Sequence, residues 1–341
     1  MLAKKGLMTS PSAVALYVEN VFSTTIYTGA GTSQTVTNNI DLASEGGMVW
    51  IKNRDAAVAS RVYDTNRGAY KEIYTSAITL ETDRTGITAG ISSFNADGFS
   101  LGSNDYNGTN QSSVKYASWT FRKAEKFFDV VTYSGDSTSG RQIAHNLGSV
   151  PGVIIVKIIS GAGNNWQVYH RSIGNTKYLQ LNTVDTPSTA TSRWNDTTPT
   201  STYFVVGNNS SVNATGSNYV AYLFAHDAGG FGAAGSDNVI SCGSYTGNGS
   251  STGPTVTIGY EPQWLLVKRT DFDGSWRIYD SVRDNSNPRT YVLYSDLTDA
   301  EEPAAPGIDF NSTSFQPKST SNDINGNGAT YIYIAIRKNM N

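Results

Sequence analysis

Three tryptophans stand where a flat aromatic ring could stack against a sugar. Trp166 and Trp276 occupy matching positions in two related stretches, and Trp194 lies in the polar stretch 191–195. Aromatic rings with a polar edge suit surfaces that are partly apolar and partly wet. Alternating placement along a strand also favours a buried position for Trp166 and Trp276, so both interpretations stay open for these two. All three are candidate glycan contacts, and Trp194 is the strongest candidate for an exposed one.

The ionisable residues form no recognisable catalytic pattern. The three histidines have unlike neighbours, and nothing in the sequence resembles a nucleophile elbow or a His-Glu-x-x-His helix. Glycan hydrolysis needs two carboxyl groups about 5–10 Å apart. The acids that could supply such a pair show no constellation in the sequence; they are Asp64, Asp280, Asp284, Glu301 and Glu302. The sequence therefore predicts no catalytic residues and a protein that is not an enzyme, with a glycan depolymerase as a third alternative.

Two glycine-rich motifs resemble cofactor or metal sites only in part. Residues 230–235 spell Gly-x-Gly-x-x-Gly, but a strand-like segment follows at 238–242, where a pyrophosphate site needs a helix. Residues 323–328 match the first half of a calcium loop, but the place of its bidentate glutamate is taken by Ile334. These departures favour a linker and an ordinary Asn-Gly hairpin. We predict no cofactor and no metal.

Three lysines end the three most apolar runs of the chain. Lys52, Lys157 and Lys268 are 105 and 111 residues apart. One interpretation is a ring of positive charge around a pseudo-threefold axis. The favoured one is structural, with each ammonium at the rim of a sheet and its stem packed on a neighbouring aromatic ring.

The elements that must position these residues repeat three times. Tyr-[Thr/Ser]-Gly triplets begin at Tyr27, Tyr133 and Tyr245, 106 and 112 residues apart, and Tyr-rich closing segments follow in the same phase. Self-similarity at a fixed period indicates a repeat architecture, and this period matches the size of an independent domain. The sequence predicts three copies of one module.

The predicted organisation has five parts. These are an N-terminal attachment segment at 1–20, repeat units at 21–124, 125–228 and 236–341, and a flexible Gly-rich linker at 229–235. Short runs of β-branched and aromatic residues alternate with turn signals, and no run shows a sustained helical period. We predict an all-β fold of three tandem β-sandwich units, jelly-roll or lectin-like, arranged about a pseudo-threefold axis or as a string of beads.

Long polar excursions differ most among the three units. They span residues 80–97, 183–201 and 296–313. Divergent loops on a rigid scaffold often carry binding specificity. We therefore expect ligand contacts to concentrate in these excursions.

Composition excludes several partners. Charged residues are only 16% and the net charge is −3, with no basic cluster of the kind that nucleic acid requires. No apolar run approaches the roughly 18–20 residues of a membrane span, and no apolar region follows the basic start as a secretory signal would need. The single cysteine, Cys242, has no partner for an internal disulfide. We expect folding in a reducing cytoplasm, no nucleic acid and no membrane insertion.

Four blocks of the sequence resemble virion structural proteins of marine tailed bacteriophages, cyanobacterial phages in particular. They are residues 17–24, 45–52, 116–123 and 143–152. The resemblance covers essentially the whole chain and implies a non-enzymatic component of the particle, of the kind described as tail fibre or tail proteins. It carries over no binding residues.

The combined expectation is a tail-associated fibre or adhesin of a phage particle. Its divergent loops would contact host-surface polysaccharide, and residues 1–20 would attach it to other virion proteins. Tethered copies raise avidity by about 10²–10⁴ over a single site. The alternative is a non-enzymatic decoration or cement protein of capsid or tail. In both cases the protein would be made in the host cytoplasm and located in the virion.

Overall fold

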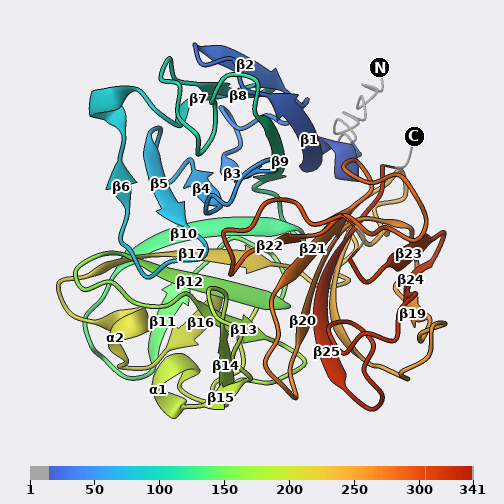
Figure 1. Ribbon diagram of the computed structural model, residues 1–341. Helices are drawn as coiled ribbons and strands as arrows, with labels where there is room; N and C mark the ends of the chain where they lie inside the picture. Colours follow the sequence, from blue (N-terminus) through green and yellow to red (C-terminus); the bar gives the residue numbers. More distant parts are fainter. Residues whose placement is uncertain (1–14, 304, 340–341) are drawn as a thin grey trace, which may run out of the picture.

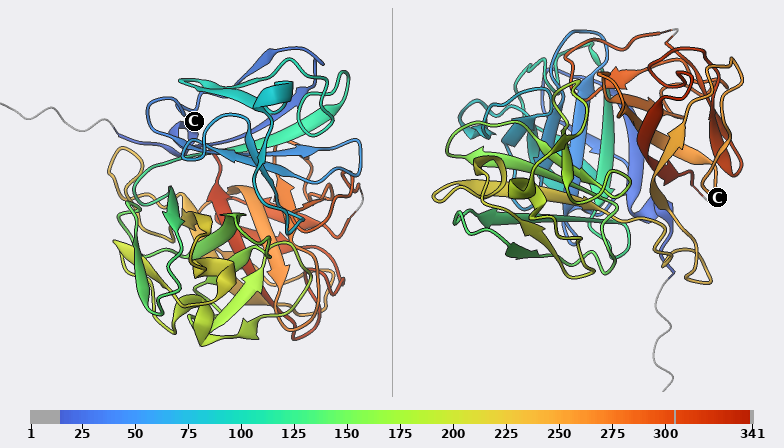
Figure 2. Two further views of the ribbon diagram at one scale, coloured as in Figure 1. Left: turned by 90° about the vertical axis from the view of Figure 1, so that its left-hand side faces the viewer. Right: turned by 90° about the horizontal axis from the view of Figure 1, so that it is seen from below.

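The computed structural model describes residues 15–303 and 305–339 and is almost entirely β (Figure 1). About 40% of it is strand and 4% helix. In the described residues, no helix has the length and apolar character needed to cross a membrane. Three groups of strands, which follow one another along the chain, form three lobes packed around a common centre (Figures 1 and 2). The predicted all-β class is confirmed.

The elements fall into three units. Unit 1 contains β1 (Phe22–Thr28), β2 (Gln34–Thr37), β3 (Gly47–Asn53), β4 (Arg61–Asp64), β5 (Lys71–Tyr74), β6 (Thr82–Asp83), β7 (Ile91–Asn95), β8 (Gly98–Leu101) and β9 (Lys115–Arg122). Unit 2 contains β10 (Phe128–Ser134), β11 (Arg141–Ala144), β12 (Val153–Ser160), β13 (Gln167–His170), β14 (Lys177–Gln180), β15 (Ser188–Thr189), β16 (Tyr203–Val206) and β17 (Asn218–Phe224). Unit 3 contains β18 (Ile240–Thr246), β19 (Val256–Thr257), β20 (Pro262–Arg269), β21 (Arg277–Asp280), β22 (Leu293–Tyr294), β23 (Ile308–Asn311), β24 (Ser314–Pro317) and β25 (Thr330–Arg337). The helices are single turns: η1 (Val18–Asn20), η2 (Thr85–Ile87), α1 (Thr191–Trp194) and α2 (Ser210–Asn213).

The large sheets of the three units share one strand order. They run β1-β9-β3-β4-β5-β6, β10-β17-β12-β13-β14-β15 and β18-β25-β20-β21-β22. In each, the opening strand pairs antiparallel with the closing strand, which in turn pairs with the strand that carries the repeated lysine. A small sheet accompanies each large one: β2-β8-β7, β11-β16 and β19-β24-β23. The segments that begin near residues 27, 133 and 245 thus have the same topology.

Each lysine strand is buried on both of its faces. Successive side chains of a strand point to opposite sides. Val49 of β3 lies in unit 1's own core with Phe99 of the small sheet, whereas Trp50 lies in a core shared with Ile155 and Leu266 of the other two units. This double burial explains why the strand is a continuous apolar run. The shared central core excludes the string-of-beads arrangement.

The expected flexible linker is an ordered loop. Phe231 is fully buried and packs edge-on against Phe127 at 6.4 Å. The Gly232 amide donates to the carbonyl of Leu16 at 2.8 Å. The loop leads into strand β18 and not into a helix, so it has none of the geometry of a dinucleotide site. Residues 229–235 therefore form an ordered connection between units 2 and 3.

Part of the expected attachment segment belongs to the body of the protein. Residues 15–20 pack on unit 1, where Val18 is fully buried and the Tyr17 amide donates to the side chain of Asn20. Residues 1–14 lie outside the described residues. The predicted boundary at residue 20 is therefore wrong for 15–20, because their apolar side chains enter the core.

The repeated Tyr-x-Gly triplet closes each unit internally. Its tyrosine stacks on the first tyrosine of the closing strand at 5.2, 5.2 and 4.9 Å, in the pairs Tyr27–Tyr116, Tyr133–Tyr219 and Tyr245–Tyr331. Its hydroxyl donates to a backbone carbonyl, that of Thr109, Val212 or Ile324. A Cβ on the glycine would lie 2.1–2.3 Å from a backbone oxygen in all three units, which leaves room only for hydrogen. The motif that revealed the repeat is structural.

A buried asparagine follows each acceptor carbonyl and fastens the same loop. In unit 3, the Asn325 amide oxygen accepts from the Asn248 N–H, and its amide nitrogen donates to the carbonyls of Ser250 and Ser319. Asn110 and Asn213 make the matching bonds in units 1 and 2. Asn325 is the asparagine of the partial calcium motif, and its oxygen is already committed to a backbone donor.

Replacing this asparagine tests its role. We expect Asn325→Ala to lower the free energy of unfolding by about 2–3 kcal/mol, because it leaves three backbone groups without their partner. Denaturant unfolding measures the loss. The matched control is Asn327→Ala, two residues away on the exposed surface, which should change stability by less than about 0.5 kcal/mol. Equal effects of the two substitutions would contradict the fastening role.

Candidate functional site at the seams between units

The three lysines join the units into a closed ring. The buried ammonium of Lys157 in unit 2 donates to the carbonyl of Ala77 in unit 1 at 3.2 Å. Lys268 in unit 3 donates to Val184 of unit 2 at 3.0 Å, and Lys52 in unit 1 donates to Thr298 of unit 3 at 3.1 Å. Each unit thus contacts the preceding one, and unit 1 contacts unit 3. We name these contact regions seam 1–2, seam 2–3 and seam 3–1.

Burial changes the chemistry of these lysines. It lowers the pKa of Lys52 and of Lys157 to about 7. Burial also lowers the pKa of Lys268, to about 8, against the opposing pull of nearby carboxylates. Lys157 does lie over an aromatic ring, that of Trp166 at 5.8 Å, as expected. The expected position at a sheet rim is wrong, because all three ammonium groups are inside the seams.

A second repeated contact crosses each seam at the column Asp64, His170 and Asp280. Asp64 accepts from the hydroxyl of Tyr222 in unit 2 at 2.7 Å, and Asp280 accepts from the indole N–H of Trp119 in unit 1 at 3.1 Å. His170 instead lies 3.2 Å from the carbonyl of Tyr333 in unit 3 through Nε2. In seams 1–2 and 3–1 the donor lies in the same unit as the donating lysine, whereas in seam 2–3 the His170 contact has the opposite direction to the Lys268 bond.

The change from acid to imidazole has a physical reason. The position that matches Tyr222 and Trp119 in unit 3 is Ile334, which has no donor for a carboxylate. Burial lowers the pKa of His170 to about 4, so a neutral ring donates to the Tyr333 carbonyl and accepts from the Ser172 amide. In units 1 and 3 an arginine follows the aspartate by three residues, Arg67 or Arg283. In unit 2 this position is Ile173. Seam 2–3 has therefore lost both partners of a buried carboxylate.

None of the three candidate tryptophans is accessible. Trp166, Trp194 and Trp276 are exposed by only 1–3%. The indole N–H of Trp166 donates to Tyr74 of unit 1, and that of Trp276 donates to Gln180 of unit 2, so both side chains belong to seams. Trp194 packs edge-on against Tyr169 at 6.1 Å from helix α1. Their prediction as glycan contacts is wrong, because a sugar cannot stack on a ring that protein already covers.

The divergent excursions begin at the seams. In seam 1–2 the Glu81 amide donates to the carbonyl of Ile159 at 3.3 Å, and in seam 3–1 the Glu301 amide donates to Arg54 at 2.9 Å. In seam 2–3 the direction reverses, with the Gly274 amide donating to Val184. The first residues of each excursion therefore have a structural role. Surface hollows lie beside them in seam 1–2 and seam 2–3.

Seam 1–2 contains the largest of the surface hollows described here, with a volume of about 470 Å³. Its lining is mainly hydroxyl and amide groups with one carboxylate, Glu81. The residues are Asn66, Arg67, Glu81, Thr132, Tyr133, Ser134, Ile159 and Asn218. The Glu81 side chain is 22% exposed and has one ion pair, with Arg67 at 3.3 Å. A hollow of this size and polarity suits a small hydroxylated ligand.

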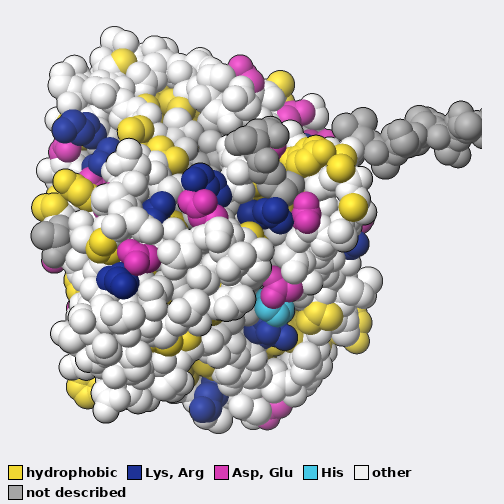
Figure 3. All heavy atoms as spheres, turned by 90° about the vertical axis from the view of Figure 1, so that its right-hand side faces the viewer, with side chains coloured by type: hydrophobic (Ala, Val, Ile, Leu, Met, Phe, Trp, Pro, Cys, Tyr) yellow, Lys and Arg dark blue, Asp and Glu magenta, His cyan; other side chains and the backbone are white. Residues whose placement is uncertain are grey.

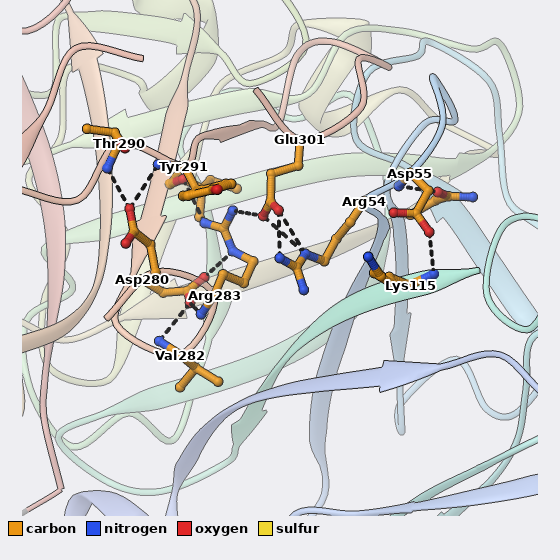
Figure 4. A network of polar contacts seen from close by, with 12 residues as sticks. Arg54, Asp55, Lys115, Asp280, Val282, Arg283, Thr290, Tyr291 and Glu301 are labelled. Carbon is orange, nitrogen blue, oxygen red and sulfur yellow. Dashed lines mark hydrogen bonds and ion pairs between the residues drawn. The ribbon is translucent and has the colours of Figure 1, made fainter. Parts of the chain in front are cut away.

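The equivalent place in seam 3–1 is closed by an ion network (Figure 4). Arg54 reaches across from unit 1 and binds both oxygens of Glu301, with Nη2–Oε2 at 2.6 Å. Glu301 also accepts from Arg283 at 2.8 Å, and Arg283 in turn binds Asp280. Glu301 is only 9% exposed. Arg54 stands at the position that Ile159 holds in the lining of the seam 1–2 hollow.

Seam 2–3 has a second hollow with a volume of about 340 Å³. Its lining includes Asp185 and Asp273 on opposite units, beside Tyr178 and Gln180. Burial lowers the pKa of Lys268, and the carboxylates of Asp296, Asp273 and Asp185 oppose this effect and raise it. The charge of this hollow therefore affects the lysine that bonds to Val184 across seam 2–3.

The acids considered for catalysis hold the structure together. Asp64, Asp280 and Glu301 lie in the seams, Asp284 accepts from the amides of Ser286, Thr290 and Tyr291, and Glu302 accepts from the hydroxyl of Tyr294. Among residues 15–303 and 305–339, no group of three or more His, Cys, Asp or Glu side chains is placed to hold a metal ion.

The sequence interpretation missed the arginines. Residues 61–67 and 277–283 both read Arg-[Val/Ile]-Tyr-Asp-x-x-Arg, and the final arginine of each binds the aspartate three residues before it. That repeat was a visible signal of two similar seams. Its absence in unit 2, which has His170 and Ile173, marked the third seam as different.

The imidazole position in seam 2–3 gives a sharp test. We expect His170→Asp to lower the free energy of unfolding by about 3–5 kcal/mol, because it buries a carboxylate without the side-chain donors that Asp64 and Asp280 have. His170→Asn, which keeps a neutral donor, should cost about 1 kcal/mol. Adding Ile173→Arg and Ile334→Tyr to His170→Asp should recover at least half of the loss, since it rebuilds the partners found in seam 1–2. Thermal and denaturant unfolding measure all three, and equal losses for Asp and Asn would refute the explanation.

Comparison with curated proteins and with solved structures finds no significant match. One family matches residues 18–339, a span that contains all three units and all three seams. Its description is a domain of unknown function (DUF7483), which states neither a ligand nor an activity. The chain belongs to the DUF7483 family.

Proposed function

We propose that this protein is a non-enzymatic, tail-associated component of a phage particle that contacts host-surface glycan. The observation that carries the proposal is the hollow of seam 1–2, where hydroxyl and amide groups surround one partly exposed carboxylate on a rigid ring. Such a lining offers both donors and acceptors to a hydroxylated ligand. The ring gives it a fixed shape, which lowers the entropic cost of binding.

The assignment to a phage particle is supported by the resemblance of four sequence blocks. In the structure these blocks contribute to β1, β3 and β9 of unit 1 and to β11 of unit 2 and the loop that follows it. They are largely framework, so the resemblance supports a common architecture and leaves the ligand to be argued from the hollows.

The contact surface differs from the one expected from the sequence. The excursions at 80–97, 183–201 and 296–313 begin by docking on the next unit, so these first residues are not free loop tips. The proposed contact is the hollow that the first excursion creates with unit 2 in seam 1–2. On the face shown in Figure 3, which is the right-hand side of Figure 1, acidic and basic side chains are interspersed.

One observation favours the alternative of a decoration or cement protein. Ile26 and Val282, which match Thr132 and Asn66 of the open hollow, are 46% and 41% exposed in units 1 and 3. Exposed apolar side chains of this kind suit burial against another protein. The edge of seam 3–1 is therefore the place where a neighbour in the particle would pack.

Particle localisation and adsorption distinguish the two functions. We expect gold-labelled antibodies against the protein to mark the tail, and an excess of purified protein to reduce phage adsorption to its host at least tenfold. An excess of protein carrying Asn218→Lys, which places a long basic side chain in the hollow, should no longer compete. Thr330→Lys, at the same position of unit 3, is the matched control and should compete normally.

Two results would contradict the proposed function. Labelling of the head together with unchanged adsorption would support the decoration protein. Release of reducing ends from host polysaccharide by the purified protein would support the depolymerase.

A further inference from the structure

Seam 1–2 and seam 3–1 are built on the same plan. Arg67 and Arg283 occupy equivalent positions, and each binds an aspartate three residues before it at 2.5 Å. Each also pairs with a glutamate of the following excursion, Glu81 or Glu301. In both seams the amide of that glutamate donates to the next unit, at Ile159 or Arg54. The two glutamates therefore have the same backbone anchor and the same arginine neighbour.

The two seams differ in what else reaches the glutamate. In seam 3–1 the Arg54 guanidinium covers both oxygens of Glu301 at 2.6–3.1 Å. In seam 1–2 the same position is Ile159, which cannot donate. Glu81 is left with the 3.3 Å contact to Arg67 and with more than twice the exposure of Glu301, 22% against 9%. Seam 1–2 thus has the carboxylate of the pair without its cation.

Arg67 has little capacity left for Glu81. Its Nε binds Asp64 at 2.5 Å, and its Nη2 donates to the Val62 carbonyl at 2.9 Å. The Nη1 that faces Glu81 also donates to the backbone carbonyl of Lys71 at 3.1 Å. Lys71 itself pairs with Asp83. A second position also differs in charge, because Asn218, which lines the hollow, stands where unit 1 has Lys115. Two positions that are basic in unit 1 are therefore uncharged in the hollow, whereas the glutamate is present in both seams.

Two other positions of the lining are polar in seam 1–2 and apolar in seam 3–1. Asn66 and Thr132 line the hollow where seam 3–1 has Val282 and Ile26. Ser134 and Asn218, whose side chains bond to each other at 2.7 Å, complete a hydroxyl and amide wall opposite Glu81. A ligand that satisfies this lining needs one cationic nitrogen and several hydroxyl groups.

We propose that the hollow of seam 1–2 binds a sugar unit that carries a free amino group, with Glu81 as its counter-ion. The ammonium takes the place that the Arg54 guanidinium occupies in seam 3–1, and the sugar hydroxyls bond to Asn66, Thr132, Ser134 and Asn218. The identity of the ligand as a surface glycan rests on the proposed function, whereas the requirement for a cation rests on the comparison of the two seams.

Matched oligosaccharides test the charge requirement. The probes are a glucosamine trisaccharide with free amines, its fully N-acetylated form and a neutral glucose trisaccharide, titrated at pH 6 and followed by NMR and calorimetry. We expect the free-amine probe to bind at least tenfold more tightly than the other two, with one site per chain and shifts in seam 1–2. Equal binding of the acetylated probe, or no binding of the free-amine probe, overturns the proposal.

Variants locate the site. Glu81→Gln should remove the preference for the free amine, and Ile159→Arg should block binding by supplying the missing guanidinium from the protein. Glu45→Gln is the matched control, a glutamate in unit 1 whose side chain is 49% exposed and outside the hollow. Unfolding curves check that each variant is folded. Unchanged binding by folded Glu81→Gln protein would overturn the proposal even if Ile159→Arg fails to fold.

The reverse substitutions should create a second site. Arg54→Ile, Lys115→Asn, Ile26→Thr and Val282→Asn together give seam 3–1 the lining of the seam 1–2 hollow, and the stoichiometry for the free-amine probe should rise from one to two per chain. This outcome is separable from the proposed function. A protein found on the head of the particle that still binds the free-amine probe through Glu81 would refute the tail assignment and leave the site intact.

Discussion

The whole structure depends on a hydrogen bond from a buried lysine of each unit to a backbone carbonyl of the adjacent unit. Lys52, Lys157 and Lys268 take their ammonium groups out of water and donate them to carbonyls across the three seams. Burying a charge is costly unless hydrogen bonds satisfy it, and each ammonium is satisfied by a carbonyl across a seam together with carbonyls of its own unit. Because these contacts run in one direction and unit 1 meets unit 3, three consecutive units close into a ring with no free end.

Ring closure explains features that a single unit would not require. The lysine strands are apolar on both faces because one face serves the unit's own core and the other the shared core. The linker and residues 15–20 are held down for the same reason, since each covers apolar surface near the junctions. A chain of this kind reproduces in one polypeptide the geometry of a cyclic trimer, while leaving each seam free to diverge.

The sequence predicted the elements well because their signals are local and repeated. Tyr133 and its counterparts recur in phase, so the strands and the all-β class were visible in the sequence. The role of the tryptophans was not visible in the sequence. A tryptophan can lie in a seam or on the surface, and only its burial in the folded structure distinguishes the two. Arg54 and Glu301 are separated by 247 positions, so nothing local in the sequence indicated that they would meet. The three seams have diverged from one another, and only their geometry shows that one is filled by an arginine and another is left open.

The central claim is that seam 3–1 is closed although the chain does not connect unit 3 to unit 1 directly. Hydrogen exchange at the Glu301 amide, which donates to Arg54 across this seam at 2.9 Å, tests the claim most directly. A closed ring predicts that this amide is protected to the same degree as the amides of strand β3. Exchange at the rate of an unstructured peptide, with β3 still protected, would show that the ring is open.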